Sequence, residues 1–182
     1  MHHPFLAGQL VDLVPPEAED AATLARWLND PAVWVPYVRH WPTNVETEQQ
    51  WISGQLSRRD ELNFMIFEKS TGQPVGLAGL RSLDAANGTG RLGLLIGEAE
   101  RRGRGLATEA VKLLVNYGFD YLGLRRVNLS VLADNAAALG LYEKLGFVRE
   151  GVERKAVLRG GKHVDVVHLA VFAEEFRGRA AK

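Results

Sequence analysis

A glycine-punctuated basic loop, RRGRGLATEA (residues 101–110), follows a flat apolar run, Leu92 to Gly97, and leads into an amphipathic segment. The first turn of a helix has main-chain N–H groups without intrahelical partners and carries the positive end of the helix dipole. Gly103 and Gly105 allow the main chain to approach an anion closely. The loop also carries three positive side chains, those of Arg101, Arg102 and Arg104. This order of strand, glycine loop and helix predicts a site for a phosphate chain, and the alternative is a solvated basic turn.

Two other nucleotide-binding loops do not match. A Rossmann loop needs a third glycine and an acidic residue about twenty positions further on, and the region around residues 124–127 has no acid. A P-loop needs the sequence Gly-Lys followed by Ser or Thr, which is absent. The loop therefore belongs to another kind of phosphate site.

The chain of 182 residues is expected to form a single domain over residues 1–182. Its 22 Lys and Arg residues balance its 22 Asp and Glu residues, which argues against direct nucleic-acid binding, because such domains are usually basic. The absence of cysteine excludes disulfides, zinc thiolates and a cysteine acyl-enzyme. The N-terminal sequence has no basic start, and no run of eighteen apolar residues follows, so we expect a cytoplasmic protein without a membrane span.

The first half of the chain is expected to hold helices and then an antiparallel meander. Helices are predicted at Glu17 to Leu28 and, from the capping box of Thr43 and Glu46, from Thr43 to about Arg59. Strands are predicted at 9–14, 64–68 and 75–83, with a hairpin turn at Asn87-Gly88. An aromatic loop with Trp34, Tyr37 and Trp41 is expected between the two helices.

The second half is more regular. Ala107, Ala110, Val111 and Leu114 form one apolar stripe of a helix, and residues 127–131 alternate as a strand does. Strand, helix and strand in this order favour parallel pairing of the two strands. A short helix from Ala136 to Leu145 with Gly146 at C′, and two long strands around 159–162, complete the pattern. We expect an α/β (α+β) fold with a mixed, mostly antiparallel sheet of six to seven strands and flanking helices.

Two motifs carry a resemblance to a known family. Arg102-x-x-Gly105-x-Ala107 resembles the acetyl-CoA pyrophosphate loop of the GCN5-related N-acetyltransferases (GNAT), and the segment from Asn135 to Phe147 is similar to that family's second signature. The stretches starting at Gly8 and Ala25 resemble the branch of ribosomal-protein N-terminal (RimJ/RimL-like) and polyamine acetyltransferases. The resemblance covers about residues 8–176. It implies transfer of an acetyl group from acetyl-CoA, as co-substrate, to a primary amine, which would be a protein N-terminus, for example of a ribosomal protein, or a small-molecule amine.

The resemblance also implies a cofactor site. In the family, a central pair of parallel strands splays apart and the pantetheine arm enters the gap, and an N–H of the first strand polarises the thioester carbonyl. The residues that would bind acetyl-CoA here are Leu95, Ile96, Gly97, Arg102, Gly103, Arg104, Gly105, Leu106, Ala107, Thr108 and Asn135. For Asn135 the other interpretation is an ordinary cap of the following helix.

Tyr142 and Glu98 are the expected catalytic residues. Tyr142 matches the tyrosine that, in many family members, protonates the leaving thiolate, and a phenol with an ordinary pKa near 10 can donate a proton while staying neutral at pH 7. A core position is the alternative for this tyrosine. Glu98 follows the strand before the loop, where a carboxylate could take the amine proton through water, although it is equally an exposed loop charge. Without a cysteine or an activated serine, direct transfer in a ternary complex is expected.

The acceptor side is less defined. Trp34, Tyr37 and Trp41 are expected to hold a cationic amine or a peptide N-terminus, or else to pack the first helices together. No metal is expected, because strand alternation places His163 and His168 on opposite faces. His168 is expected to be a hydrogen-bonded strand histidine. A homodimer is expected from relatives. The competing function is a non-catalytic acetyl-CoA-binding sensor or accessory module.

Overall fold

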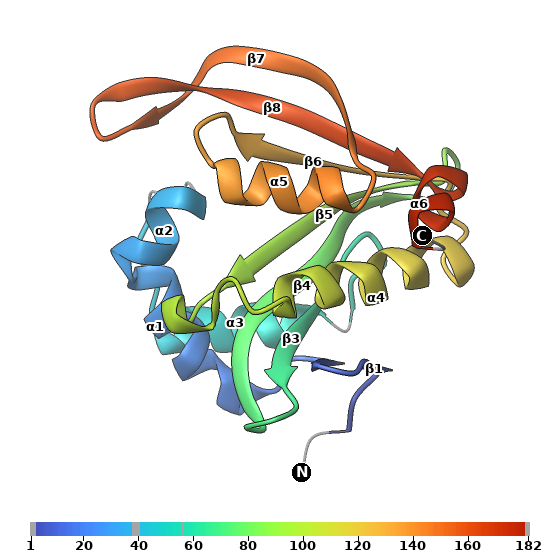
Figure 1. The fold of residues 1–182 in the computed structure, drawn as a ribbon. Helices are drawn as coiled ribbons and strands as arrows, with labels where there is room; N and C mark the ends of the chain where they lie inside the picture. The colour runs from blue at the N-terminus through green and yellow to red at the C-terminus, as the bar shows by residue number, and fades with distance from the viewer. Residues whose placement is uncertain (1–2, 38–40, 56, 181–182) are drawn as a thin grey trace. The chain divides into compact units, whose positions relative to one another are not determined.

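The computed structural model describes residues 3–37, 41–55 and 57–180 and shows a mixed α/β architecture (Figure 1). The strands are β1 (Leu6–Ala7), β2 (Val11–Val14), β3 (Leu62–Glu68), β4 (Gln73–Asp84), β5 (Thr89–Ile96), β6 (Arg126–Leu132), β7 (Val148–Arg159) and β8 (Lys162–Phe172). The helices are α1 (Ala21–Asn29), α2 (Pro31–Tyr37), α3 (Val45–Gln55), α4 (Leu106–Asp120), α5 (Ala136–Lys144) and α6 (Ala173–Ala180), with the short 3-10 helices η1 (Ala18–Asp20) and η2 (Ala99–Arg101).

Within the described residues, the strands form one eight-stranded sheet in the order β1-β2-β3-β4-β5-β6-β8-β7. The expected mixed, mostly antiparallel sheet with flanking helices is confirmed. The expected count of six to seven strands is too low, because two-residue β1 pairs with β2 through Leu6↔Leu13 and Ala7↔Asp12. Two residues are too few for a pattern of alternation to be visible in the sequence.

The chain divides into two compact units. One consists of Met1–Arg81 and Gly93–Leu114, and the other of Ser82–Leu92 and Val115–Lys182. Strands β4 and β5 and helix α4 each contribute residues to both units, so the division does not fall at a linker. A single domain over residues 1–182 stays a prediction.

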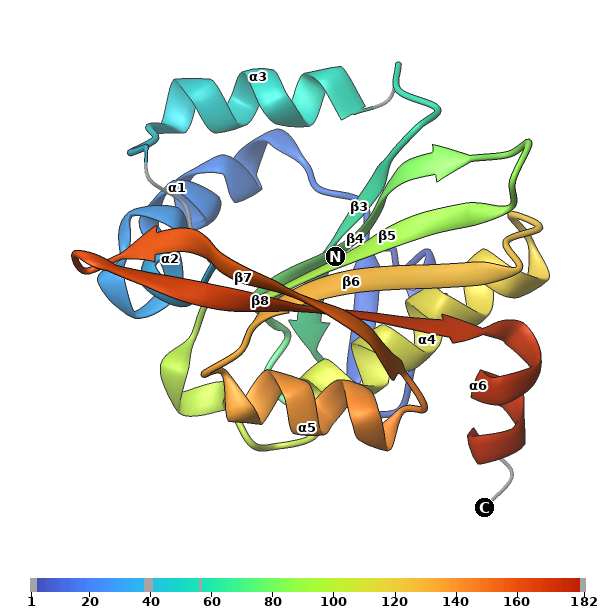
Figure 2. The same ribbon diagram turned by 90° about the horizontal axis from the view of Figure 1, so that it is seen from above.

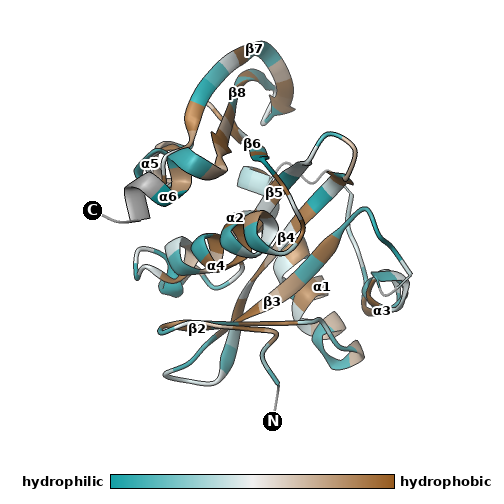
Figure 3. Ribbon diagram, turned by 90° about the vertical axis from the view of Figure 1, so that its right-hand side faces the viewer, coloured by the Kyte–Doolittle hydropathy of each residue, from teal (hydrophilic) through white to brown (hydrophobic). Residues whose placement is uncertain are grey.

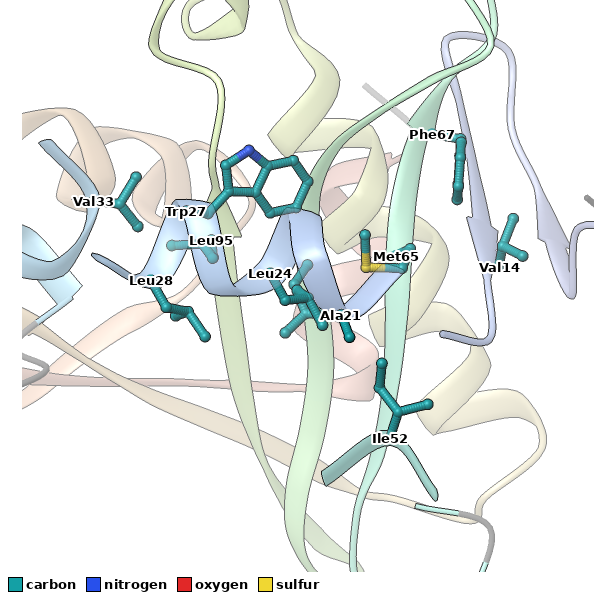
Figure 4. Close-up of a cluster of buried hydrophobic side chains, with 11 residues drawn as sticks. Val14, Ala21, Leu24, Trp27, Leu28, Val33, Ile52, Met65, Phe67 and Leu95 are labelled. Carbon is teal, nitrogen blue, oxygen red and sulfur yellow. The ribbon is translucent and has the colours of Figure 1, made fainter. Parts of the chain in front are cut away.

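The core of the first unit forms where α1 meets strands β2 to β5. Figure 2 shows α1 and α3 on the same side of β3. Trp27, Leu24 and Leu28 project from α1 into a cluster that contains Met65 of β3 and Leu95 of β5 (Figure 4). Trp27 and Met65 are fully buried. Because burial of a large apolar side chain is worth about 1.5–3 kcal/mol, this cluster holds the helix against the strands that lead to the glycine loop.

The helices of the first unit differ from expectation at their ends. The predicted helix from Glu17 to Leu28 is divided into η1 and α1. The expected aromatic loop is largely helix α2, which contains Trp34 and Tyr37. Pro31 at its first position explains the helix start, because proline is pre-set for helical φ there.

The capping box predicted for Thr43 and Glu46 is wrong. Helix α3 begins at Val45, and its first turn is capped by Asn44, whose Oδ1 accepts the N–H of Thr47 at 2.8 Å. Thr43 instead donates its hydroxyl to buried Glu48. The helix ends at Gln55 rather than near Arg59. Residue 56 lies outside the described ranges.

The second unit contains the predicted parallel pair and a long hairpin. Strands β5 and β6 are parallel over the register Thr89↔Arg126 to Arg91↔Asn128, so the predicted crossover through α4 is confirmed. Strand β6 then pairs antiparallel with β8, and β7 and β8 form the hairpin predicted around 159–162 (Figure 1). Figure 3 shows hydrophilic and hydrophobic stretches alternating along β7.

Helix α5 packs through its aromatic end. Tyr142 makes an edge contact with Phe147 at a centroid distance of 5.5 Å, and Phe147 contacts Phe176 of α6 at 6.5 Å. Gly146 has φ +98°, so the predicted left-handed residue at C′ is confirmed. No helix in the described ranges has both the length and the apolar character that crossing a membrane requires.

Glu109 in the first turn of α4 fixes the turn between β1 and β2. Its carboxylate accepts the main-chain N–H groups of Gln9, Leu10 and Val11 at 2.9, 2.6 and 2.7 Å. A side chain at Gly8 would place its Cβ 2.7 Å from Glu109 Oε2, so only glycine fits beside this carboxylate. The start of α4 is thereby tied to the N-terminal strands.

We predict that Glu109→Ala lowers the free energy of unfolding by about 1–3 kcal/mol, because three main-chain N–H groups, one of them partly buried, lose a charged acceptor. Chemical denaturation of the wild type and the variant measures this difference. Lys112→Ala, an exposed change on the same helix, is the control and should stay within about 0.5 kcal/mol of the wild type. Equal stability of Glu109→Ala and the control would contradict the anchoring role.

Candidate active site

The glycine loop presents a row of free main-chain amides. Gly103 and Gly105 adopt φ +76° and +83°, and α4 begins directly after them at Leu106. Within the described residues, no hydrogen bond uses the N–H groups of Gly103, Arg104, Gly105, Leu106, Ala107 or Thr108. The positive end of the helix dipole lies at the same place. Six consecutive donors at a helix start fit a diphosphate.

The buried carboxylate of Glu68 forms ion pairs with two arginines of this loop. Arg101 Nη1 lies 2.8 Å from Glu68 Oε2, and Arg104 Nη1 lies 3.1 Å from Glu68 Oε1. Thr71 donates its hydroxyl to the same carboxylate at 3.0 Å. The Glu68 side chain is only 3% exposed, so its carboxylate depends on these partners, and the pairing fixes the position of the loop.

The loop arginines have a different role from the one expected. Two of them are paired with Glu68, and Arg102 Nη2 donates to the carbonyl oxygens of Ala32 at 3.1 Å and Ile96 at 3.2 Å. The N–H of Arg102 is also in use, because it donates to Ala99 O. The row of available amides therefore starts at Gly103 rather than at Arg102, and the arginine side chains chiefly hold the loop in place.

The end of β5 offers one N–H on its open edge. Gly97 donates its N–H to Val75 O of β4 at 3.0 Å, so this N–H, included in the predicted cofactor site, is not available. Because successive residues of a strand direct their N–H groups to opposite edges, the N–H of Ile96 points away from β4. The contact of Ile96 O with Arg102 agrees with this direction. Leu95 is buried in the core cluster.

Gly97 is in contact with the indole of Trp27. A Cβ on Gly97 would lie 2.1 Å from Trp27 Cδ2, so no other residue fits at this position without displacing a fully buried ring. The same indole donates its Nε1–H to Glu98 Oε1 at 2.7 Å. Trp27 thus defines both the backbone at the strand end and the direction of the next side chain.

Glu98 is held as a carboxylate. Arg26 Nη2 donates to Glu98 Oε1 at 2.5 Å, and this hydrogen bond is the main reason why the pKa of Glu98 lies below its ordinary value. Partial burial opposes the shift, while the Trp27 bond and the charges of Arg26 and Arg101 add to it. A carboxylate with a lowered pKa is a weaker base, which weighs against the predicted role of Glu98 as general base.

The predicted acceptor residues lie in different environments. Trp34 and Tyr37 are on α2, and Tyr37 accepts a hydrogen bond from Arg81 Nη2 at 2.8 Å. Tyr37 packs against the core cluster, so the packing interpretation holds for this residue. Trp41 is 81% exposed, and its role as an acceptor contact stays a prediction.

The site residues of the second unit are Tyr142 and Asn135. Tyr142 is buried in α5, which agrees with the core interpretation and leaves its role in proton transfer as a prediction. Asn135 is the N-cap of α5, and its Oδ1 accepts the N–H of Ala138 at 3.1 Å. The cap interpretation of Asn135 is therefore confirmed for its oxygen, while its amide nitrogen donates to no described residue.

The histidine of the last strand is hydrogen-bonded as expected. His168 Nδ1 lies 2.8 Å from Ser130 Oγ, and Nε2 lies 3.3 Å from Glu153 Oε2. In the part of the chain that the structure describes, no three His, Cys, Asp or Glu side chains are grouped as metal ligands.

Three charged side chains with long-range partners in this region were not predicted from the sequence: Glu68, Arg81 and Arg26. Glu68 and Arg81 are charged residues within apolar strands, and this contrast was a signal that could have identified them. Arg26, the partner of Glu98, lies 72 positions earlier in the chain, and no local pattern connects the two.

We predict that Glu98→Gln lowers the melting temperature at neutral pH, because the charge-assisted bond to Arg26 is weakened. A lowered pKa in the folded state means that the stabilisation is complete above the ordinary pKa of 4.5 and is lost as the pH falls through the lower folded-state value. The difference in melting temperature between wild type and variant should therefore shrink below about pH 4.5. Exposed Glu100→Gln is the control; a difference for Glu98→Gln that stays constant down to pH 3 would contradict the assignment.

Comparison with known proteins agrees with this geometry. The family model for the acetyltransferase (GNAT) domain matches residues 11–148. An uncharacterized N-acetyltransferase, p20, of Bacillus licheniformis is 32% identical over 166 residues, which cover 89% of this chain and 92% of the relative. A putative ribosomal N-acetyltransferase of Bacillus subtilis, YdaF, is 31% identical over 107 residues, 59% of this chain and 58% of that protein.

Solved structures show the same fold. The spermidine N-acetyltransferase of Vibrio cholerae, in complex with CoA and spermine, superposes with a TM-score of 0.86 at 19% identity and covers 93% of this chain and 99% of that one. The resemblance to the GNAT family that was inferred from the two motifs is confirmed. The chain belongs to the GNAT family and is an acyl-CoA-dependent N-acetyltransferase with acetyl-CoA as its co-substrate.

Proposed function

We propose that this enzyme transfers the acetyl group directly to a primary amine in a ternary complex, with the N–H groups of Gly103 to Thr108 binding the diphosphate of acetyl-CoA. The observation that carries the proposal is the row of six amides without a partner within the described residues. Donors held in place before binding cost little reorganisation when the anion arrives. Glu68 supplies this order by fixing Arg101 and Arg104.

The end of β5 supplies the group that polarises the thioester. We assign this task to the N–H of Ile96, since the N–H of Gly97 is used by Val75. An N–H donor aimed at a developing oxyanion typically accounts for about 3–4 kcal/mol of transition-state stabilisation. The free side-chain nitrogen of Asn135 is proposed to donate to the pantetheine arm, while its oxygen caps α5.

Acetyl transfer to an α-amine needs no strong base. An α-amino group has an ordinary pKa of about 8, so roughly a tenth of it is unprotonated at pH 7, whereas the ammonium of a lysine-like amine, with a pKa near 10.4, is almost entirely protonated. Glu98, whose pKa is lowered by Arg26, can take up the proton only weakly. This favours a protein or peptide N-terminus over a polyamine. Trp34 and exposed Trp41 are proposed to contact the acceptor.

Three further properties stay predictions. A homodimer would cover exposed apolar side chains on edge strand β7, where Val148, Val152 and Leu158 are 51%, 55% and 53% exposed. The balanced charge of the chain favours a protein that does not bind nucleic acid directly. A cytoplasmic location is the third.

We predict that Tyr142→Phe lowers kcat on the order of a hundredfold and leaves the KM for acetyl-CoA nearly unchanged, because the phenol is proposed to protonate the leaving thiolate. The measurement is release of free CoA with a panel of primary amines. Tyr121→Phe removes the same hydroxyl from a tyrosine that is 78% exposed, and it should retain full activity.

Unchanged kcat in Tyr142→Phe would remove this tyrosine from the mechanism. If the wild type binds acetyl-CoA but releases no CoA with any amine in the panel, the proposed transfer reaction is overturned in favour of a non-catalytic acetyl-CoA sensor.

A further inference from the structure

Arg81 is a half-buried guanidinium without a counterion. Its Nη2 donates to the hydroxyl of Tyr37, and its Nε is buried with no acceptor in the described ranges. No described carboxylate forms an ion pair with it, although more exposed arginines such as Arg26 and Arg149 each have one. A partly desolvated positive charge without a counterion is costly. Nε itself is closed to an outside group, but Arg81 as a whole is only partly buried, so its guanidinium can still receive an anion.

The guanidinium lies above the strand that leads to the thioester-polarising position. A Cβ on Gly93 of β5 would lie 3.3 Å from Arg81 Nη2 and 3.5 Å from Nε, so the guanidinium covers this glycine. Gly93, Leu95 and Gly97 alternate along the strand and share one face. That face carries Trp27, which contacts Gly97. Arg81 therefore lies on the side of β5 that faces α1.

The hydroxyl of Tyr37 connects Arg81 to α2, the helix that also carries Trp34. The residue after Arg81, Ser82, has φ +49°, a conformation that residues other than glycine rarely adopt. Such strained residues concentrate at functional sites, where the fold forces them into place. The regular alternation of β4 is thus interrupted directly after Arg81, at Ser82.

We propose that Arg81 binds a carboxylate of the acceptor, with Tyr37 as a positioning residue. This rests on the proposed transfer to a primary amine and specifies its substrate class: an amine with a carboxylate nearby. The carboxylate is that of a free amino acid or that of an acidic residue at the N-terminus of a peptide. A guanidinium matches the planar carboxylate with two parallel N–H bonds and repels a polycation such as spermidine.

The test compares acceptors with and without the carboxylate. The kcat/KM for CoA release is calculated on the concentration of unprotonated amine, because a free carboxylate also raises the pKa of the neighbouring amine. L-leucine is paired with L-leucinamide, and the tripeptide amide Asp-Ala-Ala with Asn-Ala-Ala; spermidine is the polycation. We expect the kcat/KM of the wild type to be at least about tenfold higher for the carboxylate member of at least one pair. The pair that shows this difference tells whether the carboxylate belongs to a free amino acid or to an acidic N-terminal residue. Spermidine should be a poorer acceptor than the favoured acid.

Arg81→Gln should abolish this preference through a higher KM for the acidic acceptor, with the KM for acetyl-CoA unchanged. Arg81→Lys, which keeps the charge without the planar fork, should retain part of it. Exposed Arg91→Gln is the matched control and should behave as wild type.

A wild type that acetylates both members of each pair equally, or that favours spermidine, overturns the inference, as does an Arg81→Gln variant that keeps the preference. These results leave the proposed transfer reaction intact, because amines are still acetylated. Failure of the transfer reaction itself appears differently, as an absence of CoA release with every acceptor. The comparison of acceptors with wild-type enzyme needs no variant to fold.

Discussion

The ion pairs of buried Glu68 are the constraint on which the first unit of this enzyme depends. Glu68 lies at the end of β3, and it holds Arg101 and Arg104 of a loop more than thirty positions away. Two arginines that are fixed to a carboxylate contribute less charge to an arriving anion than free ones. What they secure is the backbone: Gly103 and Gly105 can then keep their left-handed conformation and leave consecutive amides without a partner within the described residues. Recognition by main-chain dipoles follows from this arrangement.

Trp27 fixes the end of β5, as Glu68 fixes the glycine loop. Its buried indole lies where any side chain at position 97 would have to be, and its N–H fixes the carboxylate of Glu98. The bond from Arg26 keeps that carboxylate charged. The strand end is therefore adapted to hold a backbone N–H and a charge in place, and Glu98, with its lowered pKa, is a weak base. Such a site suits an acceptor whose amine is partly neutral at physiological pH.

Local signals in the sequence were enough to predict the turns and loops whose conformation depends on a few neighbouring residues. The glycine loop, the C′ residue Gly146 and the hairpin around residues 159–162 were predicted because turn chemistry acts over a few residues. Long-range partners were not predictable in this way. The contacts of Glu68 with the loop and of Arg81 with Tyr37 join distant segments, so no periodicity reveals them. The cap of α3 shows a finer limit, since Thr43 and Asn44 are both good capping residues. Thr43 is held by main-chain bonds with the side chain of Asn29, and Asn44 is left as the cap.

Recognition of the diphosphate by the loop amides is tested most simply by a calorimetric comparison of acetyl-CoA with S-acetylpantetheine, which has the same thioester and arm but lacks the diphosphate together with the adenosine 3′-phosphate. The account predicts that acetyl-CoA binds with a Kd at least about a hundredfold lower, equivalent to roughly 2.7 kcal/mol. Equal affinities for the two compounds would show that the six amides do not bind the diphosphate and would contradict the account.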